Sequence, residues 1–80
     1  MPRYYFDLKT GNSVAVDEEG VDLSDLEAAQ SEAAQSLGAM ARDAAVTGKG
    51  TEQMEISVRD DDGPVMTVRF SYDISRKKTN

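Results

Sequence analysis

The chain has 80 residues, with 9 basic and 15 acidic side chains, so its formal net charge is −6 at pH 7. An acidic surface disfavours nucleic acid and anionic lipid as general partners, because both carry negative charge. The sequence contains no cysteine and no histidine. This excludes disulfides and thiolate metal sites, and it removes the side chain that most often acts as a general base near neutral pH.

The length fits one small domain. We expect this domain to span residues 1–75, followed by a basic flexible tail over 76–80 that carries Arg76, Lys77 and Lys78. No apolar run approaches the roughly 20 residues that a membrane helix needs. The first residues also lack the apolar stretch of a signal peptide. We therefore expect a cytoplasmic protein that has no membrane partner and needs no cofactor.

Residues 3–9 alternate between apolar and polar side chains, which is the pattern of a half-buried strand. Gly11-Asn12 suits a two-residue turn, because both residue types tolerate a positive φ. A short second strand is expected after the turn, so the chain begins with a β-hairpin. The inward side of this hairpin is predicted to carry Tyr4, Phe6, Leu8, Val14 and Val16.

An alanine-rich helix is predicted from Asp25 to about Val46. Ser24-Asp25-Leu26-Glu27 forms a capping box in which the Ser24 hydroxyl accepts from the Glu27 amide. Spacings of three and four place on one helical face Leu26, Ala29, Ala33, Leu37, Met40 and Ala44. Gly38, inside the helix, marks either a close contact or a neutral change. The segment Thr47-Gly48-Lys49-Gly50 ends the helix, with glycine expected in a left-handed cap.

A second hairpin follows the helix. Residues 53–59 and 65–72 alternate as strands around the turn Asp60-Asp61-Asp62-Gly63-Pro64, and Ile74 extends the last strand. Their inward residues are predicted to be Met54, Ile56, Val58, Met66, Val68, Phe70 and Tyr72. The order β-β-α-β-β predicts an α+β fold: a four-stranded antiparallel sheet packed on one face by a single long helix. The hairpins could meet through the first and third strands, the first and fourth, or another pair.

Three motifs in this order resemble a family of small bacterial proteins. They are Met1-Pro2-Arg3-Tyr4-Tyr5-Phe6-Asp7-Leu8, the turn Asp17-Glu18-Glu19-Gly20, and Asp25-Leu26-Glu27-Ala28-Ala29 at the helix start. That family is catalogued as a domain of unknown function and is frequent in soil-dwelling alphaproteobacteria. The resemblance implies a stand-alone protein of the same design and no known activity. The helix start is also similar to antitoxins of the HicB type, whose tyrosine-proline-rich strand and DNA-binding segment are absent here.

Two acidic clusters are candidate cation sites, because carboxylate oxygens are the ligands that calcium and magnesium prefer. The first contains Asp17, Glu18, Glu19, Asp22 and Asp25, and the second contains Asp60, Asp61 and Asp62. Neither has the ligand spacing of an EF-hand. We therefore prefer a structural role for these acidic residues. Asp25 and Glu27 interact favourably with the positive end of the helix dipole, and the other acidic side chains are solvated or lie in turns. The chain has no histidine to deprotonate a serine and no cysteine to act as a nucleophile itself, so we also expect no enzyme. On the structural interpretation of both acidic clusters, we expect no metal site.

The outward face of the sheet is the most informative feature of the sequence. Its residues are predicted to be Arg3, Tyr5, Asp7, Lys9, Ser13, Ala15, Asp17, Glu55, Ser57, Arg59, Val65, Thr67, Arg69 and Ser71. The face is thus rich in arginine and near neutral, whereas the whole chain is acidic. It could be a solvated face with cross-strand ion pairs, such as Glu55 with an arginine, or a protein interface, or a platform for single-stranded nucleic acid. The last needs several aromatic side chains, and only Tyr5 is available.

The leading hypothesis is a non-enzymatic protein-interaction module, with self-association through its sheet face or a free strand edge as one form. The candidate interaction face comprises Arg3, Tyr5, Lys9, Arg59, Thr67 and Arg69. The alternative hypothesis is an antitoxin-like regulatory partner that binds a toxin or nucleic acid. The sequence names neither the partner nor the pathway.

Overall fold

A computed structural model describes residues 1–48 and 50–77 of the chain. Arg76 and Lys77 of the predicted tail are exposed, whereas residues 78–80, and with them Lys78, lie outside the described residues. Lys49, in the segment predicted to end the helix, also lies outside them.

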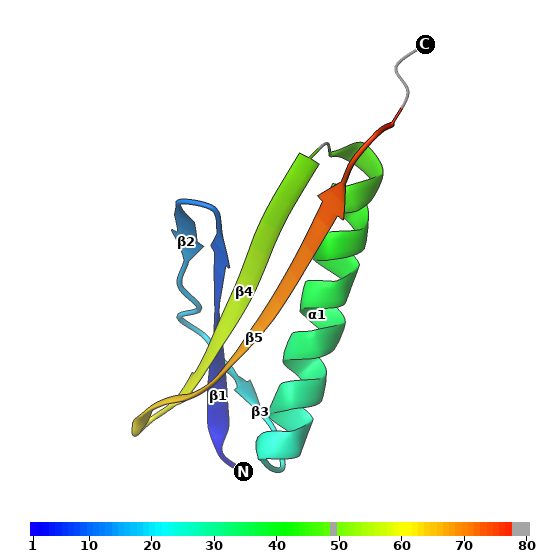
Figure 1. The fold of residues 1–80 in the computed structure, drawn as a ribbon. Helices are drawn as coiled ribbons and strands as arrows, with labels where there is room; N and C mark the ends of the chain where they lie inside the picture. The colour runs from blue at the N-terminus through cyan, green and yellow to red at the C-terminus, as the bar shows by residue number, and fades with distance from the viewer. Residues whose placement is uncertain (49, 78–80) are drawn as a thin grey trace.

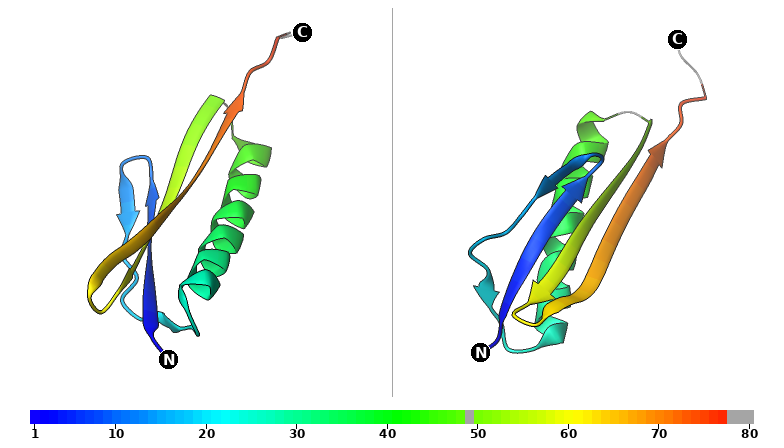
Figure 2. Two further views of the ribbon diagram at one scale, coloured as in Figure 1. Left: turned by 60° about the horizontal axis from the view of Figure 1, so that its bottom comes forward. Right: turned by 90° about the vertical axis from the view of Figure 1, so that its left-hand side faces the viewer.

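The structure is a sheet covered on one side by a single helix (Figures 1 and 2). Its elements are β1 (Arg3–Thr10), β2 (Ser13–Ala15), β3 (Val21–Asp22), α1 (Leu26–Thr47), β4 (Gly50–Asp60) and β5 (Gly63–Ile74). The antiparallel strands lie in the order β2-β1-β4-β5, and β3 pairs with β1. The α+β fold with one long helix is therefore confirmed. The two-residue strand β3 was not predicted.

The two hairpins meet through β1 and β4, the first and third of the four predicted strands. Phe6 lies opposite Val58 and Leu8 lies opposite Ile56 in this pairing. Both hairpin turns have two central residues, because Thr10 pairs with Ser13 and Asp60 pairs with Gly63.

The core lies between α1 and the inward side of the sheet, over β4 and its neighbours. Its buried residues are Tyr4, Ala29, Ala33, Leu37, Ala41, Met54, Ile56 and Val58. Small alanine side chains let the helix axis approach the strands closely. The predicted helical face is confirmed at most positions, but Leu26 is 45% exposed and Ala41 joins the core in its place. None of the helices in the described residues is long and apolar enough to cross a membrane.

The predicted orientation of the second strand is wrong. Leu8 lies opposite Ala15, and Lys9 lies opposite Val14. Residues that face each other across an antiparallel pair project from the same side of the sheet. Ala15 and Ser13 therefore share the inward side with Leu8, and Val14 lies on the outward side, 60% exposed. The cause is the two-residue turn, which pairs even-numbered residues of β1 with odd-numbered residues of β2.

Val65 was predicted on the outward face, and this is also wrong. Val58 pairs with Met66, but the next residue, Arg59, pairs with Pro64. Val65 is therefore the extra residue of a β-bulge, which breaks the alternation of side chains. Both Val65 and Met66 pack against the core as a result.

The helix caps differ from the prediction at both ends. Asp25, and not Ser24, is the N-cap, and its side chain accepts from the Ala28 amide at 2.8 Å. At the other end Gly48 is the C-cap with φ −90° and ψ 177°, so its conformation is extended and not left-handed. Glycine is needed there for close approach, because a Cβ would lie 2.5 Å from both the Ala44 carbonyl oxygen and the Tyr72 hydroxyl.

Gly38 lies inside α1, and a Cβ built on it would have no neighbour within 4 Å. It therefore marks no close contact. We expect Gly38→Ala to raise the free energy of unfolding by roughly 1 kcal/mol, because alanine loses less backbone entropy in a helix. Urea denaturation followed by circular dichroism measures this change. A loss of stability would show that the helix needs space at this position.

Candidate functional site

The six residues of the predicted interaction face lie on the side of the sheet away from α1, but they do not form one open surface. Arg3, Tyr5 and Arg59 belong to a polar network around the loop between β2 and β3. Lys9 and Arg69 flank Glu55 further along the sheet. Thr67 is exposed and lies opposite Ser57.

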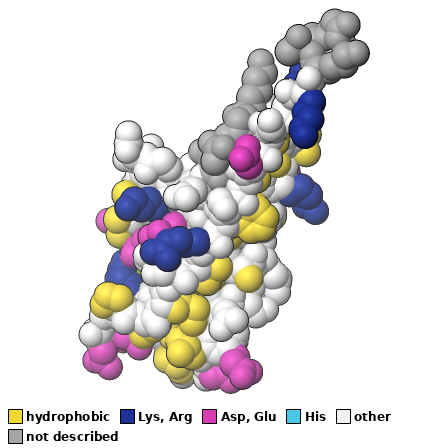
Figure 3. Space-filling view, viewed as in Figure 1, with side chains coloured by type: hydrophobic (Ala, Val, Ile, Leu, Met, Phe, Trp, Pro, Cys, Tyr) yellow, Lys and Arg dark blue, Asp and Glu magenta, His cyan; other side chains and the backbone are white. Residues whose placement is uncertain are grey.

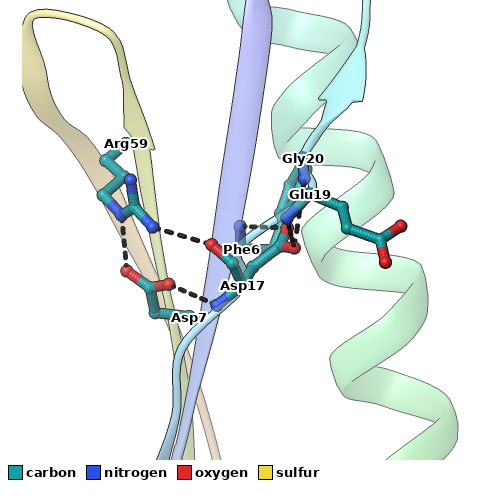
Figure 4. A network of polar contacts seen from close by, with 6 residues as sticks. All are labelled: Phe6, Asp7, Asp17, Glu19, Gly20 and Arg59. Atoms are coloured by element: carbon teal, nitrogen blue, oxygen red, sulfur yellow. Dashed lines mark hydrogen bonds and ion pairs between the residues drawn. The ribbon is translucent and has the colours of Figure 1, made fainter.

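Arg59 on β4 connects the sheet to the loop (Figure 4). Its Nε donates to the Asp7 carboxylate at 2.9 Å, and its Nη2 donates to the backbone carbonyl of Asp17 at 2.8 Å. The guanidinium also lies 4.5 Å from the centre of the Tyr5 ring, which is cation–π geometry. The hydrogen bond that Arg59 donates to the Asp7 carboxylate is the main reason that the pKa of Arg59 is raised.

Asp17 is the centre of the same network (Figure 4). Its carboxylate accepts from the backbone N–H groups of Phe6, Glu19 and Gly20, each at 3.1 Å. Its own N–H donates to the Asp7 carboxylate at 2.9 Å. The pKa of Asp17 is lowered, chiefly by the hydrogen bond from Gly20 and then by that from Phe6, because both favour the ionised form.

The hydrogen bonds of Asp17 explain how two short strands, β2 and β3, can pair with the same edge of β1. One edge of β1 pairs with β2 at Leu8 to Thr10 and with β3 at Arg3 and Tyr4. The Phe6 amide lies between the two partners, where no strand carbonyl is available. The Asp17 carboxylate takes the place of that carbonyl, so the backbone donor is satisfied.

Gly20 lets the loop lie close to β1. Its φ is +73°, and a Cβ would lie 2.9 Å from side-chain atoms of both Arg3 and Tyr5. Arg3 also holds the loop, because its Nη1 donates to the Glu19 carbonyl at 2.8 Å and its Nε donates to Asp22 at 3.0 Å. The hydrogen bond between the two side chains raises the pKa of Arg3 and lowers that of Asp22.

The three arginines of the predicted face are therefore bonded within the chain. Besides Arg3 and Arg59, Arg69 pairs with Glu55 at 3.0 Å, which is the kind of cross-strand pair expected for a solvated face. Arg69 differs from the others because its side chain is 72% exposed. It is the arginine of this face with the most surface available to a partner.

The acidic clusters have structural roles. Asp17 and Asp22 hold the loop, Asp25 caps the helix, and Asp60 accepts from the Asp62 amide at 2.8 Å in the second hairpin turn. Within residues 1–48 and 50–77, the structure has no group of three or more acidic side chains placed to hold a metal ion. Asp17 was predicted to be solvated. The Asp-x-x-Gly spacing was the signal for its actual role, because aspartate at the start of a turn accepts from backbone amides.

A depression of about 350 Å³ lies on the outward face where β1 ends beside β4 and β5. It is lined by Lys9, Gly11, Gln53, Met54, Glu55, Arg69, Phe70 and Ser71. Its charged groups are Glu55 with a basic residue on either side, so the depression does not present a strong field of one sign.

The edge of β5 is the feature that the predicted site residues missed. β5 has 12 residues and forms the end of the sheet, pairing only with β4 in the part of the chain that the structure describes. The right-hand view of Figure 2 shows β5 as the border of the sheet, with α1 behind the sheet. The helix packs on the inward side of both β4 and β5. Hydrophobic side chains form a band between β5 and α1 (Figure 3). Phe70, 44% exposed, and Ile74, 36% exposed, are large apolar residues of β5.

Comparison with protein families gave a match over residues 3–71 to the model described as Domain of unknown function (DUF6894). Searches of curated proteins and of solved structures found no significant match. The family match spans β1 to β4 and most of β5, and it thus includes the Asp17 network and the helix. The chain belongs to the family of proteins with the DUF6894 domain, for which no function is described.

Proposed function

We propose that this chain is a non-enzymatic protein-interaction module that binds its partner along the free edge of β5. The observation that carries the proposal is that one side of the 12-residue strand β5 has no partner strand among residues 1–48 and 50–77. Such an edge presents a row of backbone N–H and C=O groups that a second strand can pair with.

The sequence of β5 leaves most of this edge unprotected. Proteins commonly protect an edge strand with lysine, proline, a bulge or short length. In β5 the proline and the bulge are confined to the start, at Pro64 and Val65. From Met66 to Ile74 the strand has neither proline nor lysine, and its charged residues are Arg69 and Asp73.

The outward face supports the proposal less well than the edge. Arg3 and Arg59 are occupied by carboxylates and by loop carbonyls, and Tyr5 is stacked against Arg59. A partner on this face would have to replace bonds that already satisfy these groups. The same argument disfavours a nucleic-acid partner, and with it that form of the antitoxin-like alternative, since stacking on Tyr5 would require displacing Arg59.

A photoreactive amino acid placed on β5 tests the proposal in the native cell. We expect the variant labelled at Ser71, on the exposed edge strand, to give covalent adducts with protein. A matched variant labelled at Ser36, which is exposed on α1, should give few or none. Equal labelling from both positions, or none from Ser71, would contradict binding through the β5 edge.

A further inference from the structure

We infer that the strand that pairs with β5 is β5 of a second copy of this chain, in an antiparallel register centred on Ser71. This inference rests on the proposed function and names the partner of the same edge. In a two-fold dimer each residue contacts a residue that returns the same contact. Each residue of β5 must therefore be compatible with the residue of β5 that lies opposite it in the second copy.

Symmetry limits the registers that are available. Two identical antiparallel strands related by a two-fold axis place one residue opposite its own copy, so odd-numbered residues pair with odd and even with even. The outward and inward sides of the two sheets then continue into each other. In each pair, the backbone N–H and C=O groups of both residues point toward the other strand, or those of both point away from it. The backbone hydrogen bonds between the two edges can therefore form.

Charge selects one of these registers. Arg69 and Asp73 are the charged residues between Met66 and Ile74, and both are exposed. With Ser71 opposite Ser71, Arg69 lies opposite Asp73 of the second copy. By symmetry, Asp73 also lies opposite Arg69 of the second copy, so two ion pairs form. A register centred on Arg69 or on Asp73 would instead place like charges opposite each other, which is unfavourable.

The inward side of the same register is apolar. Phe70 lies opposite Tyr72 of the second copy, and Val68 lies opposite Ile74. Phe70 and Ile74 are the exposed apolar residues of this strand, so the pairing would cover them. Tyr72 is already positioned, because its hydroxyl donates to the Ala44 carbonyl at 3.3 Å. Both α1 helices would lie on one side of the combined sheet.

Charge reversal tests the ion pairs. We expect the wild-type chain to dimerise reversibly at micromolar concentrations in sedimentation-velocity experiments. Asp73→Arg should weaken dimerisation by about 10-fold or more, because two attractive pairs become repulsive. Arg69→Asp/Asp73→Arg should recover most of the loss. Glu55→Gln, which removes only the ion pair within one chain, and Glu32→Arg, an equal charge change on exposed α1, should leave dimerisation nearly unchanged.

Cysteine cross-linking tests the position of the axis without relying on affinity. The chain has no cysteine of its own. Only the residue on the axis lies opposite its own copy, so Ser71→Cys should form a disulfide-linked dimer under mild oxidation. Thr67→Cys, exposed on the same row of β5, should cross-link much more slowly.

A monomer at all concentrations, a dimer that Asp73→Arg does not weaken, or equal cross-linking at both cysteines would overturn the register and the second copy as partner. The proposed function would survive that result if the photoreactive variant at Ser71 labelled a different protein. It would fail with the inference if Ser71 labelled nothing.

Discussion

Replacing Asp17 with alanine is expected to lower the free energy of unfolding by roughly 2–3 kcal/mol. The carboxylate accepts from three backbone N–H groups, those of Phe6, Glu19 and Gly20. Hydrogen bonds to an ionised acceptor are stronger than those between neutral groups, and the Phe6 donor is in a part-buried position. Losing the acceptor leaves this donor without a strand partner and frees the loop from β1.

Asp17→Asn should be intermediate, because the amide retains one accepting oxygen and turns an N–H₂ group toward the remaining donor. Glu18→Gln is the matched control, since it removes the same charge from an exposed neighbour. Urea denaturation curves for the three variants separate loss of the hydrogen bonds from loss of charge. If Glu18→Gln and Asp17→Asn had equal effects, the network would not be stabilising the fold.

The same bonds predict how stability depends on pH. The pKa of folded Asp17 lies below its ordinary value of 3.8, so the ionised form is the one that the folded chain stabilises. The contribution is complete above pH 3.8 and is lost as the pH falls from there through the folded pKa. We expect the difference in unfolding free energy between wild type and Asp17→Asn to be constant near neutral pH and to shrink in acid. A difference that grew on acidification would contradict the assignment.

Gly20→Ala should destabilise the fold by roughly 2–4 kcal/mol. The positive φ of 73° is unfavourable for alanine, and the added Cβ would lie 2.9 Å from Arg3 Cγ and Tyr5 Cε2 and 3.0 Å from the Tyr4 carbonyl oxygen. The carbonyl belongs to β1, so it cannot move without disturbing the sheet. The loop would have to shift away from the strand, weakening the Arg3 and Asp17 contacts together.

Gly11→Ala is a close control for this change. Gly11 also has a positive φ, of 59°, but a Cβ there would meet nothing within 4 Å. We therefore expect Gly11→Ala to lower the free energy of unfolding by only roughly 1–2 kcal/mol, which is the cost of a positive φ for alanine. Thermal denaturation of both variants measures the excess that arises from packing against β1. Equal losses at the two glycines would show that the loop does not lie as close to Arg3 and Tyr5 as described.

The contacts of the outward arginines separate what strand alternation could predict from what it could not. Alternation along each strand correctly placed Arg3, Tyr5, Arg59 and Arg69 on the side away from the helix. Alternation carries no information on which outward groups find partners. Arg59 and Asp7 are 52 residues apart in the sequence, and they meet only because β1 and β4 pair. The open arginine-rich face was therefore predicted from side-chain direction, whereas bonds to the loop and to neighbouring strands occupy its arginines.

The amino-acid sequence alone was sufficient to predict the order of the helix and the four longer strands, the α+β class, and the inward residues of β1, β4 and most of α1. These follow from local periodicity, which is set by the geometry of strand and helix. Tertiary contacts were needed to establish that β1 pairs with β4, that Val14 faces outward and that Asp17 holds the loop. They also show β5 as the free edge of the sheet within the part of the chain that the structure describes. Each of these depends on register or on contacts between distant residues, and no local pattern specifies which segments will pair.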